Sequence, residues 1–86
     1  MRNIVKVIDK ILLEIPIEDH SGLIRSLNWL KAETDYTPPE LIPNLWKFGT
    51  SFIERVIPKP PVADWQWKVV SIWMDNSEEV LREMFK

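Results

Sequence analysis

Two stretches late in the chain carry large apolar side chains on both sides of the helices that they predict. In residues 41–57, one face holds Leu41, Leu45, Phe48, Phe52 and Val56, and its extension holds Ile42, Trp46, Ile53 and Ile57. In residues 65–74, one stripe holds Trp65, Val69, Ile72 and Trp73, and the opposite stripe holds Trp67, Val70 and Met74. A helix that is apolar on two sides needs neighbours on both. Either other helices surround these segments, or apolar surface stays exposed.

A strand is the alternative structure for residues 65–74. It would place Trp65, Trp67 and Trp73 on one face, but Ser71 falls on that face and Val70, Ile72 and Met74 fall on the other. Alternation this poor is not typical of a half-buried strand. The spacing therefore favours a helix, with Asp64 as its N-cap.

The first half of the chain predicts two amphipathic helices. Residues 2–15 place Ile4, Ile8, Ile11 and Ile15 on one stripe, and Pro16 ends the helix. The capping side chains of residues 18–21 (EDHS) then precede a second stripe that runs to about Glu33. At about 100° per residue, Trp29 lies nearly opposite this stripe, beside Arg25. Trp29 must therefore find a second neighbour or remain exposed.

Turn-forming residues mark the boundaries of the later helices. Residues 37–40 (TPPE) predict a capping box that starts the third helix at Thr37, with Pro43 either in the true first turn or at a kink. Gly49, inside the apolar face, indicates close approach of another helix. The proline-rich residues 57–62 predict a stiff, extended spacer. Asn76 or Ser77 then caps a short helix with an apolar face of Val80, Leu81, Met84 and Phe85.

These elements predict an all-α protein. We expect residues 1–86 to form a single domain, a compact bundle of four main helices plus a short C-terminal helix.

Composition argues against several classes of ligand and location. Eleven basic and 13 acidic residues give a net charge of −2 without a basic run, so we expect no nucleic-acid ligand. No stretch approaches the roughly 20 apolar residues that a bilayer requires, and charges at Lys6, Asp9, Lys10 and Glu14 argue against a signal peptide. The chain has no cysteine. We expect a soluble cytoplasmic protein.

The residues that carry enzyme chemistry are few. Only at residues 18–21 do acid, imidazole and hydroxyl groups crowd together, and Asp19 and Ser21 are there more simply explained as helix caps. One histidine and scattered carboxylates match no metal-ligand spacing, and two glycines make no phosphate-binding loop. We therefore expect no catalytic residues, metal, cofactor or small-molecule substrate.

The apolar residues exceed what one stripe per helix can bury, and two outcomes are open. The C-terminal helix can fold back over Trp67, Val70 and Met74 through Leu81 and Phe85. Otherwise these residues form an exposed interface, with Trp67 and Trp29 as anchors and Arg25 one turn before Trp29, where it can stack on the indole.

An exposed interface predicts a non-catalytic protein-binding domain. The first hypothesis is a stoichiometric inhibitor of a larger protein, of the immunity-protein, antitoxin or virus-encoded defence-inhibitor type. Acidic side chains would then cover a basic active site, namely Glu33, Asp35, Glu40 and Asp64. The second hypothesis is a subunit or adaptor whose apolar faces pair with copies of itself.

Overall fold

Apolar residues at helical spacing form helices throughout the part of the chain that the structure describes. The structure, a computed structural model, describes residues 3–82, and no strand occurs among them. The elements are α1 (Asn3–Leu12), α2 (Leu23–Thr34), the 3-10 turn η1 (Pro39–Leu41), α3 (Ile42–Val56), α4 (Asp64–Asp75) and α5 (Ser77–Arg82). The helix predicted for residues 65–74 is confirmed, and the strand alternative is wrong.

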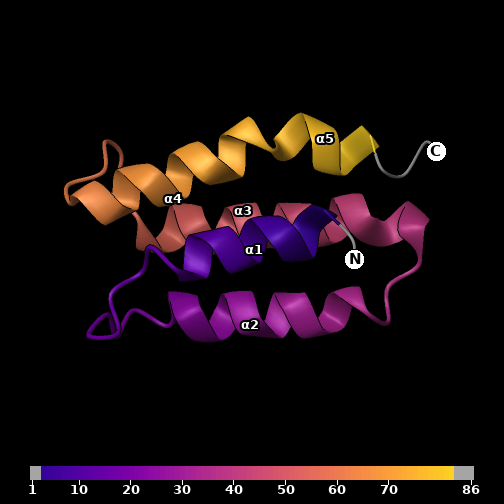
Figure 1. The fold of residues 1–86 in the computed structure, drawn as a ribbon, viewed down its shortest axis with the longest axis horizontal. Coiled ribbons are helices and arrows are strands. Elements are labelled where there is room, and N and C mark those ends of the chain that lie inside the picture. The colour runs from indigo at the N-terminus through magenta and orange to yellow at the C-terminus, as the bar shows by residue number, and fades with distance from the viewer. Residues whose placement is uncertain (1–2, 83–86) are drawn as a thin grey trace.

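The helices form a bundle in which α3 has neighbours on two sides. In Figure 1, α1 lies in front of α3, α2 runs along one side of the pair, and α4 with α5 runs along the other. Close backbone contacts join α1 with α2, α2 with α3 and α1 with α4, and α5 rests on α3 and α1. The predicted fold class, an all-α bundle with a short C-terminal helix, is confirmed.

The first helix ends earlier than the sequence predicts. α1 stops at Leu12, three residues before the predicted end at Ile15. The Glu14 N–H donates to the Ile11 carbonyl at 2.9 Å, which tightens the chain into a turn. Ile15 precedes Pro16, a position that disfavours helical backbone, yet its side chain is still buried in the core.

The second helix starts at a glycine. Gly22, the N-cap of α2, has φ of 90°, a left-handed conformation that glycine adopts without steric cost. The Ser21 hydroxyl accepts a hydrogen bond from the Leu23 N–H at 3.3 Å, so a residue of the predicted capping segment does satisfy a helix-start donor.

The third and fourth helices begin one or more residues away from the predicted caps. Pro38, not Thr37, is the N-cap of η1, and α3 follows with Pro43 in its first turn. Ala63, not Asp64, is the N-cap of α4, where Gln66 Oε1 accepts from the N–H groups of Val62 and Ala63 at 2.9 and 3.0 Å.

The connection between α3 and α4 differs from the prediction. Residues 57–62 bend, with a cis Lys59–Pro60 bond, and are not the extended spacer predicted.

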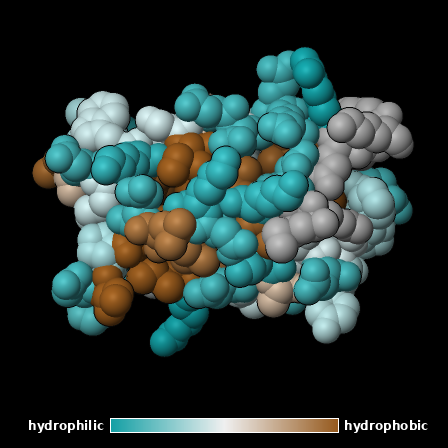
Figure 2. Space-filling model, in the orientation of Figure 1, coloured by the Kyte–Doolittle hydropathy of each residue, from teal (hydrophilic) through white to brown (hydrophobic). Residues whose placement is uncertain are grey.

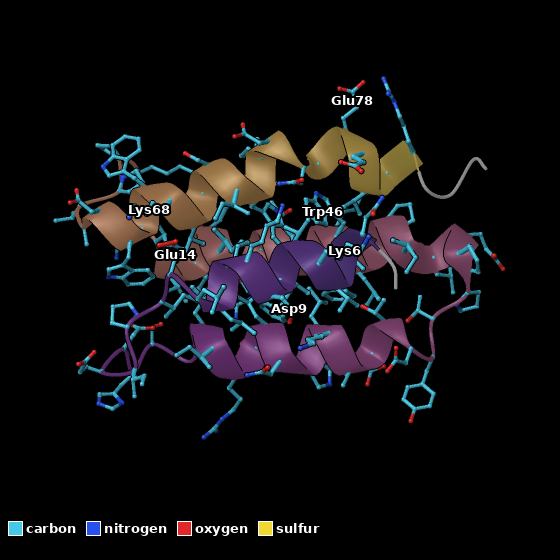
Figure 3. The ribbon with its side chains drawn as sticks, in the orientation of Figure 1. Lys6, Asp9, Glu14, Trp46, Lys68 and Glu78 are labelled. Carbon is cyan, nitrogen blue, oxygen red and sulfur yellow. The ribbon has the colours of Figure 1, made fainter. Side chains whose placement is uncertain are left out.

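Two stacked indoles fill the space between α3 and α4. The rings of Trp46 and Trp73 are nearly parallel, with centroids 3.8 Å apart and an interplanar angle of 7°. Trp46 Nε1 donates to Ser77 Oγ at 3.0 Å, and Trp73 Nε1 donates to Thr50 Oγ1 at 2.9 Å. Both buried N–H groups therefore have partners, as buried indoles require. In Figure 3, Trp46 lies between α3 and the ribbon formed by α4 and α5.

Gly49 makes room for the stack. A methyl group at this position would overlap Cη2 and Cζ2 of Trp73 and lie 2.9 Å from Leu30 Cδ2. The predicted role of Gly49 in close packing is confirmed, and the group that approaches is an indole.

We predict that Gly49→Ala lowers the free energy of unfolding by roughly 1–2 kcal/mol, because overpacking of the core outweighs the gain of about 1 kcal/mol in helix propensity. Urea denaturation followed by circular dichroism measures the change. Ser51→Ala, at an exposed position of the same helix, is the control and should leave stability equal or higher. A stabilised Gly49→Ala variant would contradict the packing described here.

We also predict that Thr50→Val costs about 1–3 kcal/mol of stability, because the variant leaves the Trp73 N–H buried without an acceptor. Thr50→Ser retains the hydroxyl and is the matched control. The comparison uses the same denaturation experiment, and equal stability of the Val and Ser variants would show that this hydrogen bond contributes nothing.

Candidate partner-binding site

The outer side of α4 carries an exposed apolar strip formed by Trp67, Val70 and Met74. Trp67 is 50% exposed and Met74 is 62% exposed, whereas Val70 is half-buried at the edge of the core. Val69 and Trp73, on the opposite side of the helix, are buried. The structure thus brings together three of the five residues expected to bind a partner, and we call them the α4 strip.

The described part of α5 does not cover the α4 strip. α5 continues in nearly the direction of α4 (Figure 1) and contacts α3 and α1, with Val80 fully buried and Leu81 half-buried. The predicted fold-back through Leu81 is therefore wrong. Met84 and Phe85, which belong to the same prediction, lie outside the described residues.

A groove of about 230 Å³ opens beside the α4 strip. Its walls come from α3, from the proline-rich connection and from α4, and its lining residues are Thr50, Ile53, Glu54, Ile57, Pro58, Lys59, Pro61, Val70, Trp73 and Met74. Most of these side chains are apolar. Val70 and Met74 belong both to the groove and to the strip, so the two features form one continuous surface.

Two ion pairs lie beside this surface. Lys68 Nζ lies 3.8 Å from Glu14 Oε2 and joins α4 to the turn after α1, and the two residues lie next to each other in Figure 3. Lys59 Nζ lies 3.6 Å from Glu54 Oε1 at the rim of the groove. Because Lys59, Glu54 and Lys68 are exposed and Glu14 is partly exposed, each pair contributes little to stability.

The other two predicted anchors lie on a different surface. Trp29 on α2 is 48% exposed, and its ring meets Phe52 of α3 edge-on, with centroids 6.3 Å apart. Arg25 is exposed one turn earlier on α2, and Phe48 of α3 is 54% exposed. Trp29 therefore packs against Phe52 and remains about half exposed. Since α3 lies between α2 and α4, Trp29 and Arg25 do not join the α4 strip.

A third group of exposed apolar residues lies between α1 and α2. Leu13 is 86% exposed and Ile17 is 91% exposed. Figure 2 shows apolar side chains gathered toward this end of the bundle, on the face where α1 lies. These two residues stand on a turn and not on a helix face.

Within residues 18–21, Asp19 and Ser21 form side-chain hydrogen bonds next to the start of α2. The Ser21 hydroxyl donates to Asp19 Oδ2 at 2.6 Å, and His20 is exposed and forms no hydrogen bond or ion pair with any described residue.

Among residues 3–82, no three His, Cys, Asp or Glu side chains are placed to hold a metal ion. None of the helices in that range has the length and apolar character needed to cross a membrane.

The sequence predicts the α4 strip but not the α3 and loop walls of the groove. The α3 and loop walls of the groove carry no sequence signal beyond the density of prolines. The spacing places Leu41 and Phe48 on one apolar face with Leu45, yet both are exposed, whereas Leu45 is buried. The buried side is centred instead on Ile42, Trp46, Gly49 and Ile53. Apolar residues cover about half the circumference of α3. Helical spacing alone therefore does not show which part of this wide apolar surface is buried.

No protein-family model matches the chain, and the comparisons with curated proteins and with solved structures found no match.

Proposed function

We propose that this protein binds another protein through the α4 strip and its groove, and that it acts as a stoichiometric inhibitor of a larger protein, of the immunity-protein, antitoxin or defence-inhibitor type. The supporting observation is the continuity of the strip with the groove. Trp67 and Met74 present apolar surface to solvent directly beside a hollow that can receive a side chain. An exposed apolar surface that contains tryptophan and methionine is typical of protein interfaces.

The negative charge around the strip suits an inhibitor that binds a basic target, which we propose to be a cytoplasmic protein. The chain has a net charge of −2, and Asp64 and Asp75 flank the strip on exposed positions of α4. Complementary charge speeds association and excludes wrong partners. An inhibitor with an acidic rim is therefore suited to a basic surface on its target, such as the active site of an enzyme that acts on a polyanion.

Self-association is the second candidate, and one observation favours it. The surface of Trp29 and Phe52 carries exposed Arg25 and Arg55, which form no ion pair with any described residue. It is thus opposite in charge to the carboxylates beside the α4 strip. A head-to-tail contact between the two surfaces would repeat from copy to copy and need not close.

Photo-crosslinking tests the proposal. We expect p-benzoylphenylalanine in place of Trp67 to crosslink a single larger protein in cells that naturally make this chain, because the side chain would lie in the interface. The same group in place of Ile17, which is more exposed but away from the groove, is the control and should crosslink weakly. Mass spectrometry identifies the products.

Two results would contradict the proposed inhibitor. Crosslinks from position 67 to the chain itself, together with a dimer or larger mass in sedimentation, would establish self-association. Equal crosslinking from positions 17 and 67, or none from position 67, would show that the α4 strip is not an interface.

A further inference from the structure

The charges left without a partner along α4 and α5 are negative. Within the described residues, the basic side chains of these helices are both engaged, Lys68 with Glu14 and Arg82 with Glu78. Exposed carboxylates that form no ion pair or side-chain hydrogen bond are Asp64, Asp75 and Glu79. The α4 side of the groove therefore has an excess of uncompensated negative charge.

The unpaired carboxylates of α4 lie on one side of the apolar strip and the groove lies on the other. At about 100° per residue, Val70 projects toward the groove, Trp67 and Met74 project outward, and Asp64 and Asp75 fall beyond them. Ser71 lies between the two large side chains and is small and exposed, so a partner backbone can approach there. Asp64 and Asp75 are about 16 Å apart along the axis, or three helical turns.

We propose that the occupant of this surface is a basic amphipathic helix of the partner protein, an inference that rests on the proposed function. An apolar side chain of that helix enters the groove, its stripe covers Trp67 and Met74, and its Lys or Arg side chains face Asp64 and Asp75. No strand exists among residues 3–82, so this part of the chain offers no sheet edge for an extended peptide to join. A groove bordered by two helices and an apolar strip fits the helix-in-groove mode instead.

A second copy of the chain fits the surface less well. Twofold pairing through α4 would bring two surfaces with the same excess of carboxylates together, and like charges in an interface are unfavourable. A head-to-tail contact would leave one strip free at the end of every chain of molecules. A basic helix from another protein would pair with the carboxylates. It would neither bring like charges together nor leave a strip unoccupied.

The test uses a fluorescent helical peptide of about 18 residues with a leucine stripe flanked by lysines, and a matched peptide with every lysine replaced by glutamate. Fluorescence anisotropy with the full chain should show at least about tenfold tighter binding of the basic peptide, and its affinity should fall as salt is added. Equal affinity for the two peptides, or no binding of the basic one, would overturn the inference.

Variants locate the peptide on the protein. Met74→Ser and Trp67→Ser should each weaken binding about tenfold or more, because they remove the central apolar contacts. Ile17→Ser, the matched exposed control, should leave binding unchanged. Asp64→Asn with Asp75→Asn should weaken binding about three- to tenfold at low salt and much less at high salt. Unchanged binding in the Met74 and Trp67 variants would also overturn the inference.

The crosslinking experiment separates this inference from the proposed function. If position 67 crosslinks a larger protein through a segment that is neither basic nor apolar on one face, the proposed function stands and the basic-helix inference fails. If position 67 crosslinks no foreign protein, the proposed function itself fails.

Discussion

The stack of Trp46 on Trp73 against Gly49 is the constraint on which the rest of this structure depends. Two indoles with centroids 3.8 Å apart occupy the space between α3 and α4, and the missing side chain at Gly49 is what admits the Trp73 ring. Because interiors are close-packed, a ring of this size fixes both the distance between the helices and the rotation of α4 about its axis. The Thr50 and Ser77 hydroxyls hold the two rings in that position.

The rotation of α4 decides which of its apolar residues remain outside. With Val69 and Trp73 turned inward, Trp67 and Met74 must point away from the bundle, since they lie on the other side of the helix. The position of α5 has the same effect. With Val80 buried, α5 packs on α3 and α1, and its described part does not cover Trp67 or Met74. The groove follows from the same spacing. The side chains of α3 and α4 hold the two helices apart. Beside the Trp73 ring, residues 57–62 fill the space between these helices only in part, and the groove is the space that remains.

The sequence predicts the helices well and their ends poorly, for a physical reason. Periodicity of apolar residues reflects burial of a whole face, so α1 to α4 could be recognised without any tertiary information. Helix starts depend on single hydrogen bonds, such as those accepted by Gln66 and Ser21, for which several neighbouring residues compete. Likewise, Trp67, Val70 and Met74 could be grouped from spacing alone, whereas Thr50, Ile57 and Pro61 join them only through the fold.

The area of the exposed tryptophans shows why a partner of the kind proposed would need the groove as well. Covering the exposed half of one indole removes on the order of 100 Å² from water, which is worth about 2.5 kcal/mol. Association costs an estimated 4–15 kcal/mol in lost freedom of motion, so Trp67 or Trp29 alone cannot hold a partner. Trp29 meets Phe52 edge-on and lines none of the groove. Trp67, by contrast, is followed on the same helix by Met74 and by a groove that can enclose a further side chain, so the α4 strip offers several contacts at once.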